Sequence, residues 1–183
     1  MKYIFDFDDV LFHTKSNLKE RVFEVYKRHG VSPEQIKEFD AIEGPVRGFS
    51  LKRLLAHFSL PLELYHEIMH NNHEYVNLEM LKLAQAAGRE NCFIVTYGDE
   101  EFQRAKIETA GLENFFREIF VVLDDKKKAV EQICEQFKDE PVIYIDDRER
   151  YFNNLDFKQY PNLKTILYTG QTKEEVEKES GLS

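Results

Sequence analysis

The segment Ile4-Phe5-Asp6-Phe7-Asp8-Asp9-Val10-Leu11 places three carboxylates directly after a short apolar run near the start of the chain. The same arrangement returns at Val142-Ile143-Tyr144-Ile145-Asp146-Asp147. Short, continuous apolar runs are typical of strands that are buried on both faces of a parallel sheet. Because parallel strands end at the same edge of a sheet, we expect the two acidic groups to face one crevice there.

Strand-like and helix-like segments alternate through the second half of the sequence. The expected strands are residues 2–5, 92–96, 119–123, 142–145 and 163–168. The expected helices cover residues 78–87, 100–110, 126–137 and 150–155, and a last helix begins near Thr172 with the spacing of a capping box. Gly88 and Gly111 are expected to end two of these helices. This alternation predicts an α/β fold in which helices cover both faces of a parallel sheet.

Residues 15–75, between the first strand and this alternating part, have helical periodicity and no convincing strand. One helical face carries Leu18, Val22, Val25 and Tyr26, and another carries Leu51, Leu54, Leu55 and Phe58. Breaks are expected at Gly44-Pro45 and at Leu60-Pro61. We therefore expect a core made of residues 1–14 and 76–183, with residues 15–75 inserted as an all-helical cap above the strand ends.

Composition narrows the class of protein. The net charge of −9 argues against a general nucleic-acid binder, because the chain lacks the basic excess that releases counterions from phosphates. No apolar stretch approaches membrane-spanning length, and Met1-Lys2 leads directly into a strand rather than into a signal peptide. Cys92 and Cys134 are too few for a disulfide framework. These features predict a cytoplasmic protein without a nucleic-acid or membrane partner.

Two further polar groups are expected at the same edge of the sheet. Thr96 ends the run Phe93-Ile94-Val95, so its hydroxyl, with the backbone N–H groups of the following turn, could donate to a phosphate. Taken alone, Thr96 is better explained as a cap of the helix near Glu100. Three lysines, residues 126–128, open a later helix, and at least one of them is expected to be solvated.

In this order, the four segments resemble the four motifs of the haloacid dehalogenase (HAD) superfamily. The resemblance implies a Rossmann-like core with the first strand at its centre. It implies that Asp6 is a nucleophile that forms an aspartyl-phosphate, and that Asp8 is the general acid/base. The presence of this second acid favours phosphate chemistry, since dehalogenase-like members lack it.

The resemblance also implies the remaining site residues. Phosphate would be bound by Thr96, Tyr97, Gly98 and a lysine, for which Lys126 fits the family spacing best and Lys127 is the reserve. Mg²⁺ would be bound by the carboxylates of Asp6 and Asp146 and by the backbone carbonyl of Asp8, with Asp147 outside the direct ligands. Hard oxygen ligands of this kind suit Mg²⁺.

An insertion between the first and second motifs corresponds to the C1 cap of the family. A small helical bundle at that position resembles the phosphoglycolate phosphatase-like branch and favours a small phosphorylated metabolite as substrate. The segments Thr96-Tyr97-Gly98-Asp99 and Asp146-Asp147-Arg148 depart from that branch, so the substrate is not identified by it. Arg47, Lys52 and Arg53 are candidates to meet an anionic substrate, although each also fits a solvated helix face.

Two other functions are compatible with parts of the sequence. A phosphotransferase or a phosphate-sensing module of the same fold would use the same acids, hydroxyl and ammonium without hydrolysis. The segment His66-Glu67-Ile68-Met69-His70 matches the H-E-x-x-H signature of zinc proteases, with His73 nearby. Its apolar neighbours are typical of an ordinary helix with one buried face, which disfavours a zinc site.

Overall fold

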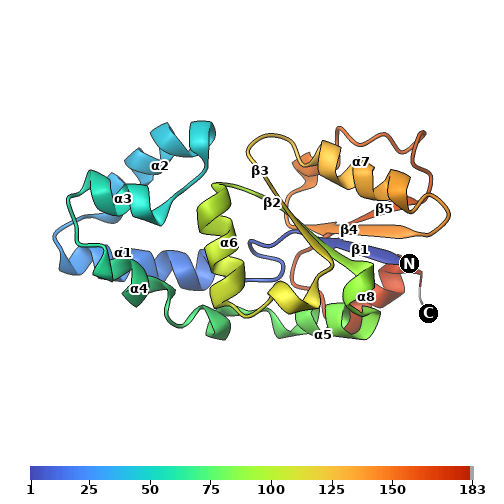
Figure 1. Ribbon diagram of the computed structural model, residues 1–183, viewed down its shortest axis with the longest axis horizontal. Coiled ribbons are helices and arrows are strands. Elements are labelled where there is room, and N and C mark those ends of the chain that lie inside the picture. The colour runs from blue at the N-terminus through green and yellow to red at the C-terminus, as the bar shows by residue number, and fades with distance from the viewer. Residues whose placement is uncertain (182–183) are drawn as a thin grey trace.

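The computed structural model describes residues 1–181, whose strands form one five-stranded parallel sheet with the order β3-β2-β1-β4-β5 (Figure 1). The strands are β1 (Lys2–Phe5), β2 (Cys92–Tyr97), β3 (Glu118–Val122), β4 (Val142–Asp146) and β5 (Leu163–Leu167). Strand β1 is central, with Phe5 opposite Ile94 of β2 and Ile145 of β4. The predicted α/β fold with the first strand at its centre is confirmed.

Helices cover both faces of this sheet, as Figure 1 shows. They are α5 (Leu78–Ala87), α6 (Glu100–Thr109), α7 (Lys127–Gln136) and α8 (Lys173–Ser180). Side chains alternate between the faces of a strand, so Ile4 packs with α7 while Phe5 packs with the other three helices. Because both faces are covered, β1 is apolar after Lys2, and β2 and β4 are apolar up to Thr96 and Asp146.

Local sequence explains where these helices begin and end. The Thr172 hydroxyl accepts a hydrogen bond from the Glu175 N–H, and the Glu175 carboxylate accepts one from the Thr172 N–H, which forms the predicted capping box of α8. The Asn77 side chain caps α5, and Gly88 ends that helix as predicted. The Asp99 carboxylate caps α6, so the helix begins directly after β2.

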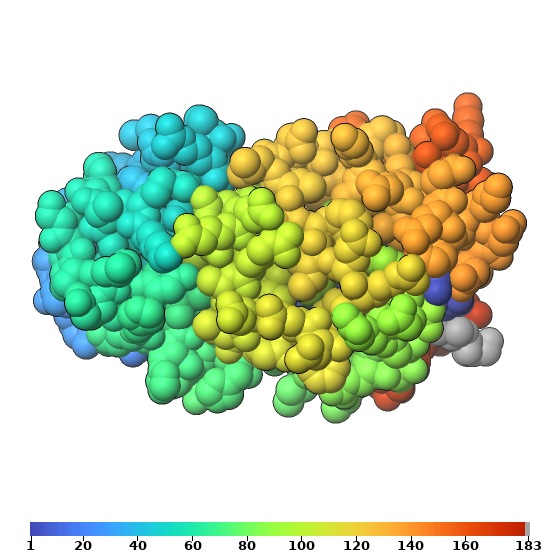
Figure 2. All heavy atoms as spheres, in the orientation of Figure 1, coloured from blue at the N-terminus to red at the C-terminus, as the bar shows by residue number. Residues whose placement is uncertain are grey.

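Residues 14–75, which we call the helical insertion, lie beyond the carboxyl ends of the strands in Figure 1. They form a π-helical turn (Thr14–Leu18), α1 (Lys19–Arg28), α2 (Pro33–Arg47), α3 (Leu51–His57), α4 (Glu63–Met69) and a 3₁₀ turn (Asn72–Tyr75). The apolar faces of these helices are buried and continue into the core beneath the sheet. Figure 2 shows the helical insertion packed against α6 on one side of the molecule. No helix among residues 1–181 is both long and apolar enough to cross a membrane.

Two of the predicted boundaries are wrong. Gly44-Pro45 does not interrupt the helix, because both residues lie in the last turn of α2, where the missing Pro45 N–H removes only one hydrogen bond. Residues 150–155 are not a helix: a single 3₁₀ turn (Glu149–Tyr151) is followed by a loop. The Asn154 carbonyl accepts a hydrogen bond from Lys127 Nζ (2.6 Å), which stabilises the loop in place of helical hydrogen bonds. The predicted break at Leu60-Pro61 is correct.

Candidate active site

Three carboxylates meet where β1 and β4 end. Asp6, Asp146 and Asp147 each offer one carboxylate oxygen, and these oxygens lie within 4.8 Å of one another. Asp6 is 4% exposed and Asp146 is fully buried. Among residues 1–181, this is the one group of three acidic, histidine or cysteine side chains close enough to share a metal ion. The expected meeting of the two acidic segments is therefore present in the structure.

One lysine lies inside this acidic cluster. Lys126 Nζ is 2.8 Å from Asp6 Oδ1 and 2.7 Å from Asp146 Oδ2, and the side chain is only 1% exposed. The Tyr144 hydroxyl donates a second hydrogen bond to Asp146 Oδ2 (2.5 Å). Lys127 Nζ is instead 2.6 Å from Glu131 on the outside of α7. The geometry thus places Lys126, and not the reserve Lys127, beside the acids.

The electrostatics of the cluster follow from its burial. Burial raises the pKa of Asp6, the Lys126 ammonium opposes this increase, and the negative charges of Asp146 and Asp8 add to it, so that the pKa stays above its usual value. Burial alone would lower the pKa of Lys126, but Asp6 and Asp146 raise it, so Lys126 remains a cation. One ammonium shared by two buried carboxylates leaves excess negative charge at this point.

The donor set fits a hard divalent cation. Asp147 Oδ1 is buried and accepts no hydrogen bond, and it lies at ion-pair distance (3.6 Å) from Arg148 Nε. The other oxygen, Oδ2, is 2.6 Å from the exposed Lys15 ammonium. Three converging carboxylate oxygens suit Mg²⁺. Asp147 therefore lies with Asp6 and Asp146 in one group of carboxylates that could share an ion.

Asp8 faces a different set of partners. The Thr14 hydroxyl and the Lys106 ammonium both bond to Asp8 Oδ1, and Gln103 Nε2 donates to Asp8 Oδ2 at 2.8 Å. Burial alone would raise the pKa of Asp8, but the Lys106 ammonium, with the Thr14 and Gln103 hydrogen bonds, holds it below its usual value. Asp8 is therefore bound by donors on both of its carboxylate oxygens.

Sequence reasoning missed Lys106 and Gln103. Both lie on the buried face of α6, where neighbouring positions are apolar, and Lys106 is only 2% exposed. A lysine and a glutamine three residues apart on an otherwise apolar helix face are a readable signal, since such residues are rarely buried without a partner. The partner, Asp8, lies 98 positions away in the sequence and could be found only from the folded structure.

The predicted phosphate-binding residues differ in whether their hydrogen-bond donors are free or already bonded within the protein. Thr96 Oγ1 is buried at the cleft described below and has no hydrogen-bond partner, so it is a free donor. The Tyr97 hydroxyl donates to the Gly44 carbonyl (3.3 Å) and joins β2 to the helical insertion. The Gly98 N–H donates to the Val122 carbonyl (2.9 Å), so in this conformation it is not free to bind phosphate. A Cβ at Gly98 would lie 2.7 Å from Gln103 Nε2, so the lack of a side chain makes room for Gln103.

Two of the three candidate cations of the helical insertion, Lys52 and Arg53, contact the core. Arg53 Nη1 is 2.7 Å from Asp99 Oδ2, and Lys52 pairs with Glu101. Gly48, which has φ +70°, packs so closely on the loop after β2 that a Cβ there would lie 2.2 Å from the Asp99 backbone nitrogen. Lys52 and Arg53 therefore hold the insertion against the start of α6. Neither they nor Arg47 line the cleft that contains the acids.

A cleft of about 650 Å³ separates the core from the helical insertion. Its core side includes Asp6, Asp8, Thr96 and Lys126. Its opposite side is formed by α1 and α2 and mixes apolar with charged side chains: Lys19, Val22, Phe23, Ile36, Lys37 and Asp40. This volume is typical of sites for small molecules. Asp6, Asp8, Thr96 and Lys126, which were predicted from three separate segments, thus line one cleft of suitable size, whereas Asp146 and Asp147 do not line it.

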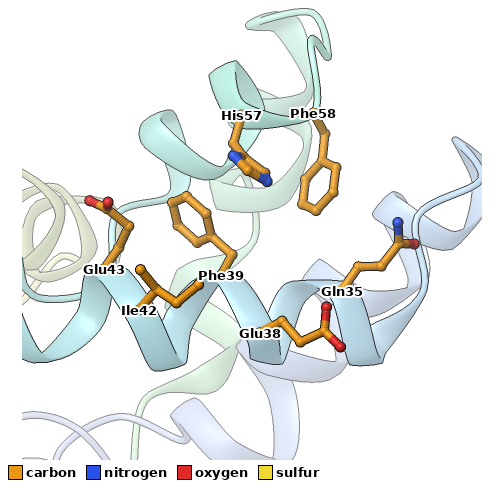
Figure 3. Close-up of a pocket in the computed structure, with 7 residues that line it drawn as sticks. All are labelled: Gln35, Glu38, Phe39, Ile42, Glu43, His57 and Phe58. Carbon is orange, nitrogen blue, oxygen red and sulfur yellow. The ribbon is translucent and has the colours of Figure 1, made fainter.

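Two other features carry no comparable chemistry. A hollow of about 250 Å³ between α2 and α3 is lined by Phe39, His57 and Phe58 with acidic neighbours, and none of the catalytic candidates lines it (Figure 3).

In the H-E-x-x-H segment, Glu67 forms ion pairs with Arg21 (3.3 Å) and Arg28. Among residues 1–181, its histidines do not belong to any group able to share a metal ion.

Comparisons with known proteins agree with this architecture. A family model described as haloacid dehalogenase-like hydrolase matches residues 3–154. The fold is similar to that of a haloacid dehalogenase-like hydrolase from Burkholderia xenovorans, with a TM-score of 0.67, 17% identity, and 89% of this chain and 81% of that chain covered. It is also similar to magnesium-bound YfnB from Bacillus subtilis, with a TM-score of 0.59, 18% identity and 98% and 97% covered.

A third similar structure is a HAD-superfamily hydrolase of subfamily IA from Geobacter sulfurreducens, with a TM-score of 0.57, 12% identity, and 98% of this chain and 96% of that chain covered. At these identities the structures show a shared fold. No curated protein matches the chain. The family model covers most of the sequence, including both acidic segments, the segment that ends in Thr96 and the lysines at residues 126–128. The chain belongs to the haloacid dehalogenase-like hydrolase family.

Proposed function

We propose that this protein is a Mg²⁺-dependent phosphomonoester hydrolase that acts on a small phosphorylated metabolite through an aspartyl-phosphate on Asp6. The observation that carries the proposal is that Asp6, Asp8 and the buried Lys126 ammonium line the same cleft. Membership of a hydrolase family supports a hydrolytic reaction. The size of the cleft supports a small substrate.

Asp6 is the proposed nucleophile. Its Oδ1 accepts hydrogen bonds from the Phe7 N–H (2.7 Å) and from Lys126, which fixes the carboxylate and leaves Oδ2 to attack phosphorus. As the Oδ2–phosphorus bond forms, the bond from phosphorus to the ester oxygen breaks. The phosphoryl group is then held as an acyl phosphate on Asp6.

Asp8 is the proposed general acid and base. In its protonated form, which is the minor form here because Lys106, Thr14 and Gln103 hold the pKa of Asp8 below its usual value, it gives its proton to the departing ester oxygen, which leaves as an alcohol. A water molecule then attacks the phosphorus of the aspartyl-phosphate while Asp8 takes a proton from that water. Inorganic phosphate leaves, and both aspartates return to their starting states.

Two groups are available to stabilise the negative charge of the phosphoryl oxygens. The Lys126 ammonium lies between Asp6 and Asp146, and the Thr96 hydroxyl is a buried donor without a partner in the protein. Fixed donors in a site that excludes water stabilise developing charge more effectively than water does. We assign phosphate binding to these two residues and to Tyr97, which also lines the cleft.

Asp6, Asp146 and Asp147, with the backbone carbonyl of Asp8, are the groups proposed to hold Mg²⁺. The Asp147 oxygen that accepts no hydrogen bond supports this assignment, and so does the magnesium bound to YfnB. When bound, Mg²⁺ draws negative charge from the phosphoryl oxygens. We further propose that residues 15–75 act as a cap, because α1 and α2 form the side of the cleft opposite the acids.

The proposed function is tested by phosphate release from a panel of small phosphomonoesters. We expect the wild-type protein to release phosphate with Mg²⁺, to fall to the buffer background in EDTA, and to recover when excess Mg²⁺ is restored. Release that persists in EDTA would contradict the metal dependence. Release from no ester, with phosphate appearing instead on an added alcohol, would favour a phosphotransferase.

A further inference from the structure

A buried lysine that belongs to none of the four motif segments contacts Asp8. Lys106 lies on α6 and is 2% exposed, and its ammonium bonds to Asp8 Oδ1. The rings of Phe7 and Phe102 lie 5.2 Å from Lys106 Nζ, and the ring of Phe12 lies 5.9 Å away. Among residues 1–181, Asp8 is the only carboxylate within ion-pair distance of this ammonium. A buried ammonium is costly without such a partner.

Gln103 lies one turn earlier on the same face of α6. Its Nε2 donates to Asp8 Oδ2 and to the Tyr97 carbonyl, both at 2.8 Å. The second bond ties the Gln103 side chain to the end of β2. Helix α6 therefore presents two donors, three residues apart, to the two oxygens of one carboxylate.

The orientation of the Asp8 carboxylate depends on side-chain partners, which are Lys106, Gln103 and the Thr14 hydroxyl. Asp8 follows the end of β1 and precedes Asp9, which has the left-handed backbone angle φ +63°. The Asp8 side chain is 21% exposed to the cleft, so without partners it could adopt several rotamers. A proton donor that is misplaced by about 1 Å loses roughly 10²-fold in rate, so a fixed direction matters for catalysis.

We propose that Lys106 and Gln103 are positioning residues that hold the Asp8 carboxylate in the orientation required for proton transfer to and from the substrate. This inference rests on the proposed function, because it assigns to Asp8 the role of general acid and base. Neither residue touches the phosphoryl group in this scheme; both act through Asp8. Their loss therefore impairs the proton transfer and leaves the attack of Asp6 intact.

The leaving group of the substrate separates these two steps. An alkyl phosphate needs a proton on its departing oxygen, whereas p-nitrophenolate departs without one. We expect Lys106→Met, which keeps the length and apolar packing of the side chain, to lower kcat/KM for an alkyl phosphate by about 10²-fold and to lower it far less for p-nitrophenyl phosphate. Lys82→Met is the matched control, because Lys82 lies on α5 and is 60% exposed.

A double-mutant cycle completes the test. If Lys106 acts through Asp8, then Lys106→Met adds no further loss with the alkyl phosphate once Asp8 is already Asn. The positioning role would be overturned if Lys106→Met lowered kcat/KM equally for both substrates and if its effect simply added to that of Asp8→Asn. If Lys106→Met does not fold, as judged by circular dichroism, then Gln103→Leu must show the same selective loss, or the inference fails. A wild-type protein that hydrolyses neither ester would overturn the proposed function and this inference together.

Discussion

Asp6→Asn is expected to abolish turnover, lowering kcat by at least about 10³-fold, because the amide cannot attack phosphorus as a carboxylate does. The substitution keeps the size of the side chain and its oxygen acceptor for the Phe7 N–H. It also removes one negative charge from a buried site that already holds Asp146. The free energy of unfolding in EDTA is therefore expected to stay the same or to increase. Phosphate release and urea unfolding of the same preparation check both results.

The matched control for this variant is Asp125→Asn, a change of the same chemistry at an acid near the start of α7 that does not line the cleft. It is expected to turn over like the wild-type protein. An Asp6→Asn protein that folds normally and retains more than about a tenth of wild-type kcat would remove Asp6 from the role of nucleophile. An Asp6→Asn variant that loses activity because it unfolds would also contradict the prediction, since removing a negative charge from this buried site is expected to leave the protein stable.

Lys126→Met is expected to lower both activity and stability. The change leaves Asp6 and Asp146 buried without the ammonium that now lies 2.8 Å and 2.7 Å from them. Removing one partner of a buried ionic group typically costs about 3–5 kcal/mol of folding free energy. Loss of a fixed charge beside the phosphoryl oxygens is expected to lower kcat by about 10²–10³-fold. Urea unfolding and steady-state kinetics measure the two effects separately.

Lys127→Met is the matched control for that prediction, because the two lysines are adjacent and only Lys126 reaches the acids. Lys127 pairs with Glu131, donates a hydrogen bond to the Asn154 carbonyl and is 38% exposed, so its loss is expected to lower stability far less than the loss of Lys126 and to leave kcat near the wild-type value. The reverse pattern, with Lys127→Met inactive and Lys126→Met active, would contradict the placement of Lys126 in the site.

The part of the fold that the sequence predicts well is the part governed by strong local signals. Continuous apolar runs identify strands, and a parallel sheet brings their ends to one edge, so the meeting of Asp6 with Asp146 follows from topology alone. The capping box at Thr172 is similarly local. The choice between Lys126 and Lys127 depends on tertiary contacts, because the two lysines are adjacent at the start of α7 and only Lys126 reaches Asp6 and Asp146.

Other features depend on tertiary contacts that no local pattern reveals. Helix α2 continues through Pro45 because the proline falls in the last turn, where few hydrogen bonds remain to be lost. The loop after Tyr151 depends on the hydrogen bond from Lys127 to the Asn154 carbonyl. Lys106 and Gln103 were missed because their partner, Asp8, lies in the first motif, far away in the sequence.

The most direct test of the central claim is to identify the residue that carries the phosphoryl group. Asp8→Asn slows hydrolysis of the intermediate, so this variant is mixed with Mg²⁺ and p-nitrophenyl phosphate, quenched in acid and analysed by mass spectrometry. We expect a burst of p-nitrophenol equivalent to the enzyme present and one phosphoryl group on the peptide that contains Asp6. A phosphoryl group on another residue, or steady release of p-nitrophenol with no covalent adduct, would contradict that claim.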